Sequence, residues 1–126
     1  MLVDHPMTLT IPVSDLERAR SWYEDKLGLA PVQEVPGEAL AYRTGAGQSL
    51  LLFFSDEAGA VEHQLAAWRI DDLAAEVSEL RGRGVRFEEY DRPDLRTVDG
   101  IAVTPVGRAA WFKDSEGNVF TITQLS

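Results

Sequence analysis

The sequence contains no cysteine among its 126 residues. Disulfide bonds, thiolate catalysis and zinc sites built on cysteine are therefore excluded, and the absence is consistent with a reducing compartment. No apolar run approaches the roughly 20 residues that a membrane-spanning helix needs. The first residues carry no basic segment followed by an apolar one, so no signal peptide is predicted. We expect a cytoplasmic protein without a membrane partner.

Positively charged residues are scarce. Lys and Arg number 12 against 21 Asp and Glu, which gives a formal net charge of −9. Most of such a surface would repel a polyanion, so no nucleic-acid partner is predicted. Solubility explains the charge, and attraction of a cationic ligand is a second interpretation. The hydrophobic and charged fractions, 44% and 26%, are those of an ordinary globular chain, and the length suits one domain over residues 1–126.

The first half begins with residues 7–13, which alternate apolar and polar side chains as a half-buried strand does. Ser14 and Glu17 have the spacing of a capping box and predict the start of a helix, which Gly28 ends. Glycine-containing turns then separate three predicted strands, at about residues 31–35, 39–44 and 49–55.

The second half repeats this order. A strand is predicted over residues 63–70, and Asp71 or Asp72 caps a second helix. A long loop is expected over residues 89–106, of the kind that often covers a binding site. The remaining predicted strands lie at residues 85–88, 108–113 and 118–124.

Strand, helix and three strands thus occur twice, which predicts an α+β fold of two β-α-β-β-β modules. Module one covers about residues 7–55, a linker covers 56–62, and module two covers about 63–125. Two curved mixed sheets of this kind can pack side by side around a central cavity that suits a small ligand.

Several short segments, in this order and spacing, resemble the vicinal-oxygen-chelate superfamily. They are VSDLERA at residues 13–19 with the following WY and LGL, IDDL at 70–73, and AWFKDSEGN at 110–118. That superfamily includes glyoxalase I, bleomycin-resistance proteins, fosfomycin-resistance enzymes and extradiol dioxygenases. The resemblance covers about residues 7–125 and implies the glyoxalase/bleomycin-resistance-like fold and a homodimer.

The resemblance also implies where a metal would be held, with one ligand on each of four strands. Nitrogen, carboxylate or thiolate donors are needed there. Leucine offers no donor and a neutral threonine hydroxyl is a poor one, so we predict no metal and no cofactor. His5 and His63 remain as candidates for a two-histidine site without matching carboxylates. The four positions are Thr8, Leu52, Leu65 and Thr121.

Strand alternation together with the family register predicts a cavity wall that is mostly apolar, with hydroxyl groups and one cation. Arg69 would need Glu88, an anionic ligand group or solvent as its partner. Trp111 is either a ligand contact or part of the core, and Tyr42 and Tyr90 are either hydroxyl contacts or structural. The ligand-binding candidates are Thr8, Thr10, Tyr42, Leu52, Phe54, Leu65, Ala67, Arg69, Trp111 and Thr121.

The resemblance to the bleomycin-resistance branch therefore favours a metal-free protein that binds an apolar or cationic small molecule, such as an antibiotic. The ligand would lie in the cavity between modules or across a homodimer. Three alternatives stay open: a metal-dependent lyase, isomerase or dioxygenase with a non-standard site; a metal-free enzyme using Arg69, Tyr42 or His63; and a structural or regulatory module.

Overall fold

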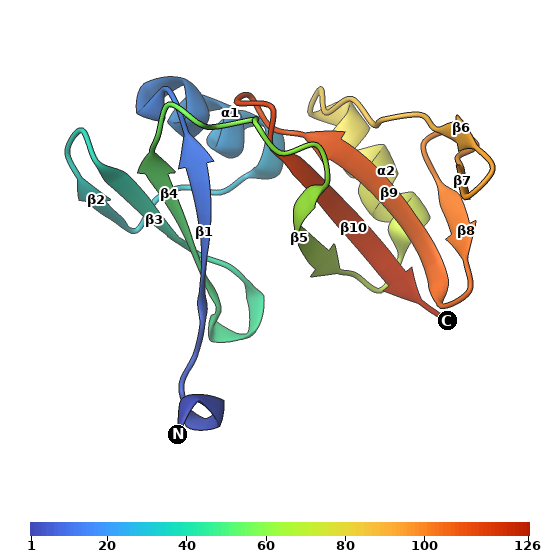
Figure 1. Ribbon diagram of the computed structural model, residues 1–126, viewed down its shortest axis with the longest axis horizontal. Helices are drawn as coiled ribbons and strands as arrows, with labels where there is room; N and C mark the ends of the chain where they lie inside the picture. Colours follow the sequence, from blue (N-terminus) through green and yellow to red (C-terminus); the bar gives the residue numbers. More distant parts are fainter.

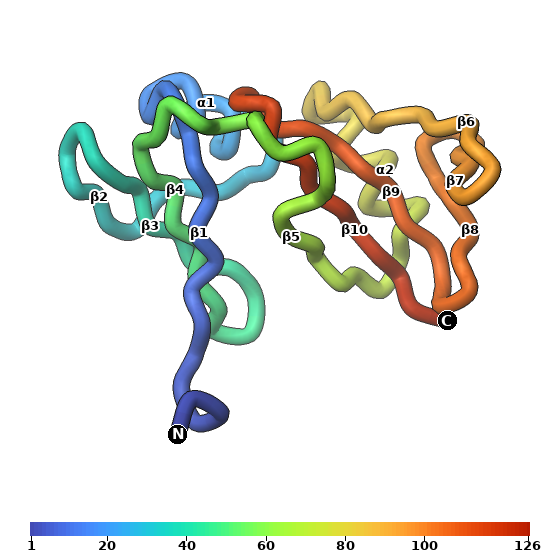
Figure 2. Tube along the Cα trace, viewed as in Figure 1, coloured from blue at the N-terminus to red at the C-terminus, as the bar shows by residue number.

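Two four-stranded mixed sheets lie side by side, each with one long helix, in the computed structural model, which describes residues 1–126 (Figure 1). The tube in Figure 2 shows that the chain completes the first sheet and its helix before it enters the second. This arrangement confirms the predicted α+β fold of two β-α-β-β-β modules. Neither helix has the length and hydrophobicity required to cross a membrane.

Module one forms the first sheet in the order β1-β4-β3-β2, in which β1 and β4 are parallel. A short 3-10 helix at Leu2–Asp4 precedes it, and another at Gly45–Gly47 separates β3 from β4. The elements are β1 (Thr8–Val13), α1 (Leu16–Leu27), β2 (Gln33–Val35), β3 (Ala39–Arg43) and β4 (Ser49–Phe54).

Module two forms the second sheet in the order β5-β10-β9-β8, with β5 and β10 parallel. A two-stranded hairpin, β6-β7, lies outside this sheet. The elements are β5 (Gln64–Arg69), α2 (Leu73–Gly82), β6 (Asp91–Arg92), β7 (Leu95–Arg96), β8 (Ala102–Thr104), β9 (Gly107–Lys113) and β10 (Val119–Leu125).

Two predictions for module two were wrong in detail. Residues 85–88 make only one isolated bridge, Phe87 to Phe112, and the edge strand of the sheet is β8. The expected loop 89–106 therefore contains three short strands. Strands of only two or three residues show too little hydrophobic alternation to be recognised from the sequence.

The predicted capping box of the first helix was also wrong. Asp15 is the N-cap, and its side chain accepts a hydrogen bond from the Arg18 N–H at 3.0 Å. The Ser14 hydroxyl instead donates a hydrogen bond to the carboxylate of Glu116, which is 102 residues away in the sequence. The other helix limits were predicted correctly, since Gly28 ends α1 with φ 71°, a left-handed conformation that suits glycine, and Asp72 caps α2.

One continuous hydrophobic core joins the two modules. Phe112 of β9 lies at its centre, with ring centroids 6.3 Å from Trp22, 6.2 Å from Trp68 and 5.7 Å from Phe120. Trp22 belongs to α1, so the helix of module one packs against the sheet of module two. Trp68 and Trp22 are partly buried and pack against this core.

Candidate functional site

The two faces of the first sheet differ from the expected assignment. Leu52 and Tyr42 were predicted to face the cavity, but both lie in the core beneath α1, with 0% and 1% of their surface exposed. Thr10 is paired with Leu51, and paired residues on neighbouring strands point to the same side. The side of the sheet away from the helix, here called the concave face, therefore carries Leu51 in place of Leu52.

Phe54 and Leu65 also lie elsewhere than predicted. Phe54 has the parity of the buried Leu52, and at the exposed end of β4 it lines a hollow beside the first turn of α1. Leu65 is half-buried and packs against the hydrophobic core. The four positions where a metal was considered therefore do not face a common cavity. Leu52 and Leu65 pack in or against the core, and Thr8 and Thr121 line two different hollows.

A hollow of about 680 Å³ does separate the modules, between β1, the start of β4 and β5. Thr8, Thr10 and Ala67 line it together, as predicted, and all three side chains are exposed. The rest of the lining includes Met7, Leu9, Gln48, Ser49 and Ala66, so the hollow is uncharged and combines apolar with hydroxyl and amide groups.

A second hollow, of about 220 Å³, lies on the concave face of module two. Trp111 and Thr121 are paired across β9 and β10 there. Both donate hydrogen bonds to the Oε1 atom of Gln64 on β5, from Trp111 Nε1 at 3.0 Å and from Thr121 Oγ1 at 2.6 Å. Three strands of module two thus bring together an indole, a hydroxyl and an amide, here called the Trp111 cluster.

Gln64 was missed by the sequence analysis. The pairing of β10 with β5 shifts between Val119, which faces Gln64, and Phe120, which faces Ala66. Leu65 is the extra residue of this bulge, and such an insertion changes which side chains share a face. Simple alternation therefore gave the wrong neighbour, and no signal in the sequence marks the bulge.

The Tyr90 ring extends the Trp111 cluster. It meets the Trp111 ring edge-on, with centroids 5.6 Å apart and planes at 90°, and the Arg92 guanidinium lies 5.1 Å from the Tyr90 centroid. Edge-to-face contacts of this kind are favourable, as is a cation over an aromatic face. Residues of the predicted covering loop therefore do lie beside the concave face, and they hold one edge of the indole.

Arg69 lies on the same sheet, paired in register with Thr123, and its side chain is exposed. Glu88, one of its expected partners, is instead 3.9 Å from Lys113. Exposure to solvent is thus the outcome among the three alternatives considered for Arg69.

Both histidines are exposed and belong to no cluster of metal-ligating side chains. His63 is exposed, and its Nδ1 atom lies 2.9 Å from the Gln64 carbonyl oxygen, while His5 is exposed ahead of β1. No group of three or more His, Cys, Asp or Glu side chains could hold an ion. The threonine and leucine side chains at the positions implied by the family likewise do not fit a divalent metal.

Glu116 joins the end of module two to the start of α1. Its Oε1 accepts hydrogen bonds from the backbone N–H groups of Ser14, at 3.0 Å, and Asp15, at 2.9 Å, and its Oε2 lies 2.7 Å from Arg18 Nε. Burial acts to raise the pKa of Glu116, but hydrogen bonds from Arg18, Ser115, Ser14 and Asp15 outweigh it and lower the pKa to about 2. A carboxylate there also suits the positive end of the helix dipole.

Asp114 forms a second polar link beneath this one. Its carboxylate accepts from the Tyr23 hydroxyl at 2.7 Å, from Asn118 Nδ2 at 2.9 Å, and from the backbone N–H groups of Glu116 and Asn118. Burial raises the pKa of Asp114, and these hydrogen bonds oppose the rise. Asp114 and Glu116 thus belong to the turn between β9 and β10 and also connect the two modules.

Two fused β-α-β-β-β modules with an open concave face define a paired-module α+β protein. Residues 3–122 match the family model described as the Glyoxalase/Bleomycin resistance protein/Dioxygenase superfamily. The chain therefore belongs to this superfamily. A search among curated protein sequences found no significant match.

Solved structures show the same fold. TnmS3, an antibiotic-binding protein from Streptomyces sp. CB03234, is 29% identical, with 100% of this chain and 99% of that chain covered and a TM-score of 0.74. A glyoxalase/bleomycin resistance protein from the same organism is 29% identical, with 95% and 100% covered and a TM-score of 0.66. A fosfomycin resistance protein from Listeria monocytogenes is 16% identical, with 98% and 92% covered and a TM-score of 0.67, a likeness of fold alone.

Proposed function

We propose that this protein binds an aromatic, antibiotic-like small molecule on the concave face of module two without transforming it. The observation that carries the proposal is the Trp111 cluster, an indole held in place by Gln64 and Tyr90 beside an open hollow. A rigidly held aromatic side chain offers a large contact area with little ordering cost. The similarity to an antibiotic-binding protein supports the same class of ligand.

Gln64 supplies polar specificity in this proposal. Both hydrogen bonds that it receives go to Oε1, which orients the amide, and its Nε2 group has no partner within the chain. Two N–H donors are thus available to a carbonyl or hydroxyl oxygen of the ligand. Because Gln64 is exposed in the free protein, only a ligand that covers this amide would be selected for a matching acceptor.

The lining favours a neutral ligand over a cationic one. Neither hollow on the concave side contains an acidic side chain, and Arg108 is the one charged residue that lines the hollow of the Trp111 cluster. Attraction of a cation would rest on the net charge of −9 alone, which salt screens over about 10 Å. We therefore place apolar aromatic molecules with oxygen acceptors ahead of cations.

Replacing Trp111 with alanine is expected to weaken binding by roughly 30-fold or more, because it removes the aromatic surface on which the ligand stacks. The measurement is a thermal-shift screen of aromatic natural-product antibiotics, followed by titration of the hits against both proteins. Val32→Ala, at an exposed site of module one, is the control and retains binding.

We propose that this binding is independent of metal, so EDTA leaves the thermal shifts unchanged. Stoichiometric nickel, zinc, iron or manganese in the purified protein would instead support the metal-dependent alternative. Failure of the whole panel to shift the unfolding temperature would contradict the binding proposal itself. We also propose that the protein works in the cytoplasm, which cell fractionation tests.

A second copy of the chain is proposed to complete the site as a homodimer. The N-terminal segment extends away from both modules (Figure 1). Met1, Leu2, Val3 and Met7 are 87–93% exposed, so this segment presents apolar side chains without a partner. Exposed apolar patches of this kind commonly mark association surfaces.

Light scattering is expected to give twice the 13.9 kDa mass of one chain. A charge in the interface would be costly to bury, so Met7→Lys should shift the protein toward monomer. Val103→Lys, on the outer edge strand of the second sheet, serves as the matched control. A monomeric wild-type protein would remove the shared site and leave only binding within one chain.

A further inference from the structure

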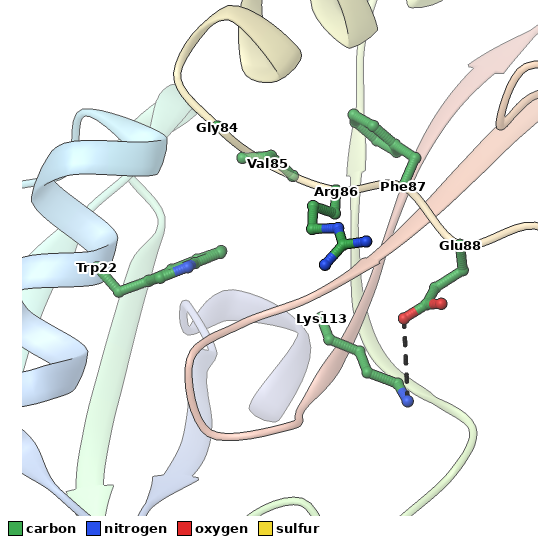
Figure 3. Close-up of a pocket in the computed structure, with 7 residues that line it drawn as sticks. All are labelled: Trp22, Gly84, Val85, Arg86, Phe87, Glu88 and Lys113. Atoms are coloured by element: carbon green, nitrogen blue, oxygen red, sulfur yellow. Dashed lines mark ion pairs between the residues drawn. The ribbon is translucent and has the colours of Figure 1, made fainter.

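A separate hollow of about 400 Å³ lies between α1, the segment that follows α2 and the end of β9. Trp22 of α1 forms one wall, the segment 84–88 forms a second, and Lys113 at the end of β9 closes it (Figure 3).

Cations gather around this hollow although the chain as a whole is acidic. The Arg86 side chain projects into the hollow between Trp22 and the Lys113–Glu88 pair (Figure 3), and it has no ion pair or hydrogen bond within the chain. Lys113 is 3.9 Å from Glu88, and both side chains are solvent-accessible, which makes this ion pair weak. The Nζ atom of Lys26 also lies against Gly84 at the rim.

The indole of Trp22 is fixed in position. Its ring stacks on Phe112 in the core, with centroids 6.3 Å apart and planes at 25°, and meets Tyr23 edge-on. Because Trp22 also lines the hollow, the hollow has a packed aromatic wall beside a free guanidinium. A planar guanidinium matches a carboxylate with two parallel hydrogen bonds, and an aromatic wall suits a planar ring.

We propose that this hollow binds a planar aromatic carboxylate. The ligand ring lies against Trp22, its carboxylate pairs with Arg86, and Lys113 exchanges its weak contact with Glu88 for the same carboxylate. The site does not depend on the proposed function, because no residue that lines this hollow also lines the hollow of the Trp111 cluster.

The test uses 1-naphthoate as the probe and the full chain as the protein. Amide and indole resonances are followed by nuclear magnetic resonance during titration of the wild type, of Arg86→Gln and of Arg43→Gln. Arg43 is an exposed arginine without an ion pair in module one, so it controls for the loss of one surface charge. The neutral analogue 1-naphthylmethanol controls for the carboxylate.

We expect 1-naphthoate to shift the Trp22 indole and residues 84–88, and Arg86→Gln to weaken binding about tenfold, the loss of one charge-assisted contact. Arg43→Gln and Trp111→Ala leave it unchanged, and 1-naphthylmethanol binds more weakly. The proposal is overturned if 1-naphthoate does not bind at millimolar concentration, if Arg86→Gln binds it as the wild type does, if the neutral analogue binds equally well, or if the shifts centre on Trp111.

Discussion

Replacing Phe112 with alanine is expected to lower the free energy of unfolding by about 3–5 kcal/mol, the range for removing a buried phenylalanine. Phe112 is 1% exposed and packs against aromatic rings from α1, β5 and β10. The substitution leaves a cavity at the point where the two modules share one core, and rigid neighbours in different elements cannot easily collapse into it. Denaturation in urea monitored by circular dichroism measures the change.

Trp111→Ala is the matched control because Trp111 is the residue directly before Phe112 on the same strand. Trp111 points to the concave face and is only half-buried, so its loss should cost much less stability while it removes ligand binding. This pair of variants separates the two faces of β9. Similar losses of stability in both would show that Trp111 is part of the core, and would count against the proposed binding site.

Glu116→Gln is expected to lower the free energy of unfolding by about 2 kcal/mol at neutral pH, since charge-assisted hydrogen bonds are worth about 1.5–3 kcal/mol each and an amide keeps only part of them. The variant retains the shape of the side chain but loses the negative charge that faces Arg18 and the first turn of α1. Glu62→Gln removes one exposed carboxylate and is the control for net charge.

The pH dependence of this difference has a definite sign. The pKa of Glu116 in the folded protein is lowered from 4.5 to about 2, so its stabilising contribution is complete above pH 4.5 and is lost as the pH falls toward 2. Wild type and Glu116→Gln should therefore converge in stability over that interval. An unchanged difference across it would mean that the charge of Glu116 does not act on folding.

Asp114 contributes with the opposite sign. Burial raises the pKa of Asp114 in the folded protein above 3.8, so its contribution is complete below pH 3.8 and is lost as the pH rises through the higher folded value. Subtracting the Glu116→Gln curve from the wild-type curve removes this background, because Asp114 is present in both proteins. The comparison thus isolates Glu116 from its neighbour.

Local patterns in the sequence were sufficient for most of the architecture. The repeated order of strand and helix and the Gly28 and Asp72 helix limits depend on contacts within a few residues, where periodicity and capping rules apply directly. The same rules placed Thr8, Thr10 and Ala67 in one hollow correctly, because neither β1 nor the end of β5 contains an irregularity at these residues.

The pairing of distant strands decided which side chains face the core, and the sequence did not reveal this pairing. Leu52 and Tyr42 are core residues because β4 pairs with β1 in a register that sets Leu51 beside Thr10, and an offset of one residue reverses every side chain. The same dependence explains Gln64, whose position beside Trp111 follows from a bulge opposite β10.

The capping of α1 has a similar cause, since Glu116 reaches its first turn from about a hundred residues away. The sequence by itself thus determined the paired-module fold and its shortage of metal donors. Only the tertiary structure decided which side chains share a face, because strand register and contacts between distant segments depend on the packing of the whole chain.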